Sequence, residues 1–174
     1  MNSKTALGVV MLALSTTAGA TGAGVSPGSL SISGWLASRI VGAYQTEARV
    51  RVCGSSDPYE TVKNMILFNA GGTVIAQPQL ASTGLPGLYG PGLGTRGPDF
   101  GTWFYNSRTN LYSVKLRYET FVDGVFHGAG IVEREIQLSA DDNTAYGRVH
   151  VTVLAPDGSK VAEICGTAVS TRFE

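Results

Sequence analysis

From Gly42 to the C-terminus, apolar and polar residues alternate in short runs, and this period of two is typical of β-strands. No part of this region has helical spacing over a useful length. Gly, Asn, Asp and Pro separate the runs and favour tight turns. The pattern predicts eight strands, at about 43–53, 61–69, 73–77, 100–105, 111–122, 127–138, 144–155 and 160–173.

Short turns join nearly all of these strands, so neighbours in sequence should pair antiparallel. A meander of eight strands can remove its exposed edges by closing on itself. A two-sheet sandwich needs longer crossover connections, which are not evident after residue 100. We therefore predict an all-β fold, an eight-stranded antiparallel up-and-down barrel. The one long connection, 83–99, is rich in Gly and Pro, and we expect it to cover the barrel mouth with Leu88 and Tyr89.

The N-terminus has the features of an export signal. Lys4 supplies a positive charge, residues 6–14 form an apolar run, and Ala18-Gly19-Ala20 matches a small-residue cleavage site. The run is too short for a membrane anchor, which needs about 20 apolar residues. We assign 1–20 to a signal peptide cleaved near Ala20, 21–41 to an N-terminal arm with one helical turn, and 42–174 to the barrel domain. The mature protein would be secreted or periplasmic, with no transmembrane anchor.

An exported chain would be expected to pair Cys53 with Cys165, the two cysteines of the sequence. The disulfide would close a loop of roughly 110 residues and stabilise the fold by up to about 4.7 kcal/mol. The alternative is two unrelated buried thiols. The two cysteines, His127 and His150 lack the ligand spacing of a metal site, so we expect no metal.

A bridge between opposed residues would also fix the register of the first and last strands. With Cys53 opposite Cys165, the even-numbered residues of both strands share one face, and those residues are small or apolar. We therefore place the even face inside and the disulfide on the outer wall. The first and last strands would then be neighbours, as closure requires.

The same register places Tyr44 opposite Glu174, with Arg172 as its diagonal neighbour on the inner face. A guanidinium stacked on the Tyr44 ring would seal the end of the barrel. The alternative is a frayed tail with Arg172 in water.

Several motifs carry a resemblance to a known group of barrels. Gly42-Ala43-Tyr44, the later Cys53 and the terminal arginine resemble the calycin pattern, most familiar in lipocalins, although Tyr44 stands where Trp is usual. The region 42–174 also resembles a family of uncharacterised exported bacterial proteins of lipocalin-like shape. The motifs matched to that family lie at 68–73, 96–103, 165–168 and 172–174. The resemblance implies a lipocalin-like barrel and supplies no activity.

Alternation also predicts which side chains line the interior. The inward set comprises Tyr112, Val114, Leu116 and Tyr118 on one strand and Val149, Val151 and Val153 on another. The strand at 127–138 is ambiguous, but its more apolar even face would carry Arg134 inward. A buried Arg134 would be costly unpaired and would suit a carboxylate-bearing ligand. The alternatives are an interior salt bridge, or a bulge at Gly128 or Gly130 that turns it outward.

The remaining chemistry is sparse. The 13 basic residues equal the 13 acidic ones, which excludes the basic footprint of a nucleic-acid-binding protein. Glu133 and Glu135 share one strand face, an arrangement more typical of a solvated surface than of a hydrolase. No nucleophile motif, phosphate loop or dinucleotide fingerprint is present, so we expect no catalytic residues and no cofactor.

Three hypotheses follow. The first, which we favour, is a non-enzymatic exported barrel that binds a small apolar ligand between Tyr112, Leu116, Tyr118, Arg134, Val149 and Val151. The second is a small barrel cyclase or isomerase, by analogy with allene oxide cyclase at the level of fold alone. The third is a ligand-free envelope or extracellular interaction module, whose sign would be an exposed apolar patch formed by 83–99 and 21–41.

Overall fold

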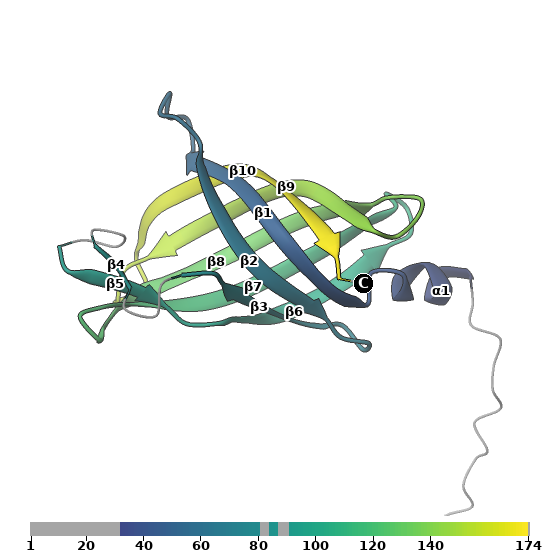
Figure 1. Ribbon diagram of the computed structural model, residues 1–174, viewed down its shortest axis with the longest axis horizontal. Helices are drawn as coiled ribbons and strands as arrows, with labels where there is room; N and C mark the ends of the chain where they lie inside the picture. The colour runs from purple at the N-terminus through teal and green to yellow at the C-terminus, as the bar shows by residue number, and fades with distance from the viewer. Residues whose placement is uncertain (1–31, 81–83, 87–90, 174) are drawn as a thin grey trace, which may run out of the picture.

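The computed structural model describes residues 32–80, 84–86 and 91–173. This part of the chain forms one short helix and ten strands (Figure 1). The elements are α1 (Ile32–Ser38), β1 (Gly42–Val52), β2 (Glu60–Phe68), β3 (Thr73–Pro78), β4 (Leu85–Pro86), β5 (Leu93–Arg96), β6 (Asp99–Asn106), β7 (Leu111–Val122), β8 (Val125–Leu138), β9 (Thr144–Leu154) and β10 (Lys160–Arg172).

Eight of the strands close into an antiparallel barrel. The order around the wall is β1, β2, β3, β6, β7, β8, β9 and β10, and β10 returns to pair with β1. All of these pairings are antiparallel, and most join strands that follow one another along the chain. The predicted all-β barrel is therefore confirmed, with strand limits within about two residues of those expected from alternation.

The segment 83–99 differs from the expected irregular loop. It contains β4 and β5, and β5 pairs with the end of β7 from Gly94↔Val122 to Arg96↔Thr120. We call β4 and β5 together the β4–β5 ribbon. These strands are short and contain Gly and Pro, so the sequence shows no recognisable alternation there. Leu88 and Tyr89 lie outside the described residues, as do the expected signal peptide, 1–20, and the first part of the arm.

The pairing of β1 with β10 runs from Tyr44↔Arg172 to Val52↔Ile164. The expectation that Cys53 lies directly opposite Cys165 is wrong by two residues, because Arg51 is the partner of Cys165. Cys53 follows the last ladder pair, and its amide donates a hydrogen bond to the carbonyl of Glu163 over 2.9 Å. The disulfide is thus diagonal. A displacement of two residues leaves every side chain on the expected face.

The Cys53–Cys165 disulfide itself is present, as predicted. It spans 112 residues of sequence, and the two Cα atoms are 5.0 Å apart. It fastens the end of β1 to β10 at one opening of the barrel, which we call the rim. The rim also includes the β1–β2 loop and the start of β2.

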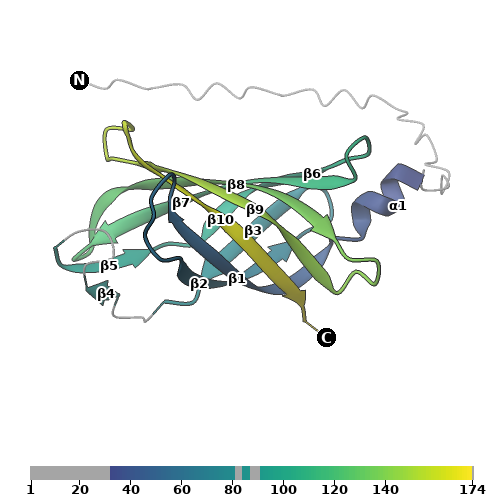
Figure 2. The ribbon, with the colours of Figure 1, turned by 90° about the horizontal axis from the view of Figure 1, so that it is seen from above.

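The opposite end of the barrel is closed by α1 and by a chain of aromatic rings, which we call the aromatic plug. Figures 1 and 2 both show α1 at this end and the β4–β5 ribbon at the other. Successive ring centroids are 5.0 to 6.3 Å apart, mostly in edge-on or tilted geometry. The members are Tyr44, Phe68, Trp103, Tyr112 and Tyr105.

Arg172 connects the plug to the backbone. Its guanidinium lies 4.7 Å from the centre of the Tyr44 ring and donates to the Tyr44 hydroxyl. It also donates to the carbonyls of Val41 and Asp142, at 2.8 and 3.0 Å, and to that of Arg39. Gly42 leaves room for this group, because a Cβ at Gly42 would lie 2.4 Å from Arg172 Nη1.

Removal of the disulfide should destabilise the barrel without changing its fold. The double variant Cys53→Ala/Cys165→Ala should lose about 2–5 kcal/mol of unfolding free energy, because the unfolded chain regains the freedom of a long loop. Urea unfolding followed by circular dichroism measures the difference. Wild-type protein treated with a thiol reductant should show the same loss, and an unchanged midpoint in both samples would contradict the prediction.

Loss of Arg172 should be costly for a different reason. Arg172→Met leaves three backbone carbonyls without their donor, and we expect a loss of about 3 kcal/mol or more. Arg172→Lys should not restore stability, because an ammonium cannot reproduce the planar set of donors. Tyr44→Phe removes one hydrogen bond and should cost about 1 kcal/mol. Equal stability of the Lys variant and the wild type would refute this assignment.

Candidate functional site

The barrel interior contains a cavity of about 280 Å³ between the aromatic plug and the rim. Its walls are largely aliphatic, with Leu116, Val132, Val149, Val151 and Ile164 facing the lumen. Space arises because small residues stand on β1 and β10: Ala48 and Ala168 are directly opposed. At the rim the lining continues to Arg51, Val52, Asp57, Pro58 and Glu60.

The deep end of the cavity is polar, because Thr46, Asn64 and Arg134 line it. Ser170 does not line the cavity but is hydrogen-bonded to Thr46 and Arg134, and we call the four residues together the floor. Thr46 is the register partner of both Asn64 on β2 and Ser170 on β10. The hydroxyls of Thr46 and Ser170 share a hydrogen bond of 2.7 Å. Arg134 Nη2 reaches across β9 and donates to Ser170 Oγ over 3.3 Å. Thr46, Arg134 and Ser170 are all buried.

Arg134 is the unusual member of the floor. Only 5% of its surface is exposed, and its Nε has no hydrogen-bond partner. Among the described residues, no carboxylate forms an ion pair with it. Burial therefore lowers the pKa of Arg134 to about 10, because the charged guanidinium is removed from water without a compensating anion.

A second charged group lies on the wall of the cavity. Arg96 donates through Nε and Nη2 to the two oxygens of Asp99, with 3.1 Å for the Nε contact. The same guanidinium stacks 3.5 Å from the centre of the Tyr118 ring. Tyr118 can lie flat against β8 because its register partner is Gly130, where a Cβ would approach the ring to 2.1 Å.

Asp99 is almost fully buried, and the two effects on its carboxyl oppose each other. Desolvation raises the pKa of Asp99 above its ordinary value, while the hydrogen bonds and charge of Arg96 pull it down. The bidentate geometry uses both carboxylate oxygens. Asp99 is therefore arranged as the partner of Arg96 and not as a free base.

The structure brings five of the predicted site residues together. Leu116, Tyr118, Arg134, Val149 and Val151 all line the cavity. Tyr112 faces inward but lies in the aromatic plug, where its hydroxyl donates to the carbonyl of Leu36 and burial raises its pKa to about 12. Tyr112 is thus a structural residue of the closed end and does not line the cavity.

Of the floor, sequence reasoning predicted Arg134 and missed Thr46, Asn64 and Ser170, and it also missed the Arg96–Asp99 ion pair on the wall. Thr46 and Ser170 are even-numbered residues of β1 and β10, the face predicted to point inward. They were not named as site residues because only apolar positions of these strands were considered for the lining. Asp99 shares the inner face of β6 with Trp103, at alternate positions along the strand. Arg96 could not be found by alternation, since it belongs to the short strand β5.

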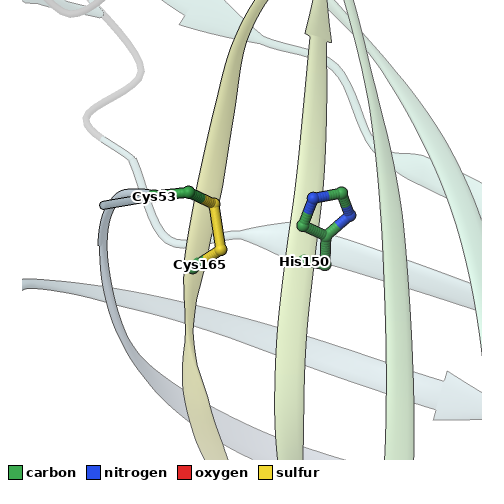
Figure 3. A group of neighbouring side chains, drawn as sticks. All are labelled: Cys53, His150 and Cys165. Atoms are coloured by element: carbon green, nitrogen blue, oxygen red, sulfur yellow. A yellow bond between two sulfur atoms is a disulfide. The ribbon is translucent and has the colours of Figure 1, made fainter. Parts of the chain in front are cut away.

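On the outer wall, His150 lies beside the disulfide (Figure 3). It is the register partner of Cys165, and its ring nitrogens are 3.9 Å from Glu133 and 3.8 Å from Glu163. Donor atoms of Cys53, His150 and Cys165 lie within 4.8 Å of one another. This proximity was not evident from sequence spacing. Both sulfurs are bonded to each other, so neither is a thiolate available to a metal.

Comparison with known proteins found no matching family model, no matching curated protein and no matching solved structure. Within the described residues, no helix is sufficiently long and apolar to traverse a bilayer. The cavity and its polar groups are therefore the features that bear on function.

Removal of Arg96 should leave the buried carboxylate of Asp99 without its partner. Arg96→Met should cost about 3–5 kcal/mol at pH 7, and Arg96→Met/Asp99→Asn should recover a substantial part. In the single variant the folded-state pKa of Asp99 rises further above its unfolded-state value. As the pH falls, Asp99 is therefore protonated in the folded protein at a higher pH than in the unfolded chain. The deficit should therefore shrink as the pH is lowered from 7 to 5. Urea unfolding at both values measures it, and a deficit that grows on acidification would contradict this assignment.

Proposed function

We propose that the protein is a non-enzymatic, exported, lipocalin-like barrel that holds a small, largely apolar molecule in its lumen. The supporting observation is a cavity closed by the aromatic plug, walled by aliphatic side chains and continuing to the rim. Pockets of this character are the usual binding sites of small molecules. The disulfide is compatible with an oxidising compartment outside the cytoplasm.

The dimensions of the cavity limit the ligand. Sites for drug-sized molecules span about 300–1,000 Å³, and this cavity of about 280 Å³ lies at the lower limit. The small residues Ala48 and Ala168 are what keep it open. A ligand of the size of a medium-chain hydrocarbon, with its long axis along the barrel, fits these proportions.

The other two hypotheses receive less support. For a cyclase, the buried carboxylate of the described lumen, Asp99, is already engaged by Arg96. For an interaction module, the expected joint patch of 83–99 and 21–41 does not form between α1 and β5, which lie at opposite ends of the barrel. Exposed apolar residues instead form a row across the outer faces of β2, β3 and β6, through Leu67, Ile75 and Phe100.

Filling the cavity should abolish binding. Ala168→Phe places a ring in the lumen and should weaken the binding of a neutral fluorescent probe, N-phenylnaphthylamine, by at least about tenfold, because the apolar contact area is lost. Val169→Phe is the matched control. It adds a ring at the adjacent residue, which points to solvent with 52% of its surface exposed.

Fluorescence titration at equal protein concentration compares the three proteins. The wild type and the Val169 variant should bind alike, and circular dichroism verifies that both variants are folded. Probe binding that persists in a folded Ala168→Phe protein, or is absent from the wild type, would place the function elsewhere.

A further inference from the structure

The floor of the cavity is built around a cation that no described side chain neutralises. Arg134 comes from β8, while its one hydrogen-bonded side-chain partner, Ser170, comes from β10 on the far side of β9. The side chain therefore extends over the lumen. The Ser170 hydroxyl also forms a hydrogen bond with the Thr46 hydroxyl, so it is shared between Arg134 and Thr46.

The unused donor has a defined position. Arg134 Nε is buried and unpartnered, and Nη2 on the same edge of the guanidinium uses one contact for Ser170 Oγ. Nη2 carries two N–H groups, so it can donate to Ser170 and to one further acceptor, and the N–H of Nε is a second donor next to it. Two parallel donors match the two oxygens of a carboxylate.

A second unpaired atom lies on the same polar row. The Asn64 Oδ1 is buried and without a hydrogen-bond partner, and Asn64 lines the cavity beside Thr46. Unpartnered buried polar atoms are rare in folded proteins, and each costs free energy. Arg134 Nε is a donor that carries part of a full positive charge, and a bound acceptor would complete it. Asn64 Oδ1 is an acceptor, so it needs a donor such as a water molecule and would not be satisfied by an anion.

We propose that the cavity binds an amphipathic monocarboxylate, with the carboxylate paired to the Nε and Nη2 edge of Arg134 and the hydrocarbon part directed toward the rim. This inference rests on the proposed ligand-binding function and adds the chemistry of the head group. The aliphatic residues Leu116, Val149 and Val151 contact the hydrocarbon chain, and one guanidinium balances one negative charge. A dianionic phosphate head would leave a charge unpaired on this floor.

Unpaired burial of Arg134 also makes the empty protein less stable than it could be. Burying a charge without a partner costs free energy, and an apolar side chain of similar volume does not carry this cost. Arg134→Met should therefore fold, with a higher urea midpoint than the ligand-free wild type. A group that costs stability in the empty protein and gains a partner on binding is typical of a functional site.

Competition for bound N-phenylnaphthylamine tests the proposal with three competitors of equal chain length: decanoate, decanol and methyl decanoate. For the wild type, decanoate should compete at concentrations roughly tenfold to hundredfold lower than the two neutral molecules, as expected for a charge-assisted hydrogen-bonded pair. In Arg134→Met this advantage should disappear while decanol is retained. Arg134→Lys, which keeps the charge and loses the paired donors, should show an intermediate advantage.

Arg148→Met is the matched control. It makes the same substitution on the neighbouring strand, at an exposed position of the outer wall opposite Glu135. This variant should keep the full preference for decanoate. If Arg148→Met loses the preference as well, the effect is one of overall charge and the proposed floor contact is wrong.

The possible outcomes distinguish failure of the carboxylate site from failure of the apolar-ligand function. Equal competition by decanoate and decanol in the wild type overturns the carboxylate site and leaves the apolar-ligand function in place. Failure of the probe and of all three competitors to bind the folded wild type overturns both. A decanoate preference that survives in folded Arg134→Met also overturns the assignment of the head group to Arg134.

Discussion

The pairing of β1 with β10 is the interaction on which the rest of the structure depends. It converts a meander into a closed wall, removes the two edge strands, and gives the molecule an inside. It also brings Thr46 next to Ser170 and Tyr44 next to Arg172, residues more than a hundred positions apart. The polar floor and the sealed end of the barrel are both products of this one seam.

The seam is secured at both of its ends by different chemistry. At the rim the disulfide joins Cys53 to Cys165, and at the closed end Arg172 donates to three backbone carbonyls from two segments, the α1–β1 connection and the β8–β9 turn. Between them the ladder is ordinary antiparallel pairing. The covalent bond acts mainly on the unfolded chain, whereas the arginine acts on the folded one, so the two contributions to stability are distinct in origin.

Much of this fold could be predicted from the sequence, because a strand with one buried and one exposed face alternates apolar and polar residues. That pattern is strong from 42 to 174 and carries the strand limits, the inward faces and the barrel class. It does not report register, since a shift of two residues leaves the pattern unchanged, and this is why the exact partner of Cys165 was missed. It does not report β4 and β5 either, because these strands are too short to show an alternation.

The candidate site was predictable only in part, for a related reason. Apolar alternation identifies the walls, so Leu116, Val149 and Val151 were found. In the floor, Arg134 was found because its neighbours on the even face of β8 are apolar, whereas Thr46, Asn64 and Ser170 are polar positions that a search for apolar residues discards. Whether Arg134 is paired depends on which side chains meet across the lumen, and this is a property of the closed barrel that no single strand encodes.

The aromatic plug closes one end of the barrel, and the cavity continues to the rim at the other end. A ligand that enters at the rim would have to displace water from the cavity through the same opening. The ligand would also leave by that opening. In the proposed binding mode the carboxylate lies deepest, so it would pass the rim before the hydrocarbon on entry and after it on departure. The residence time of such a ligand would depend on two separate steps, the breaking of its contact with Arg134 at the floor and its passage through the rim.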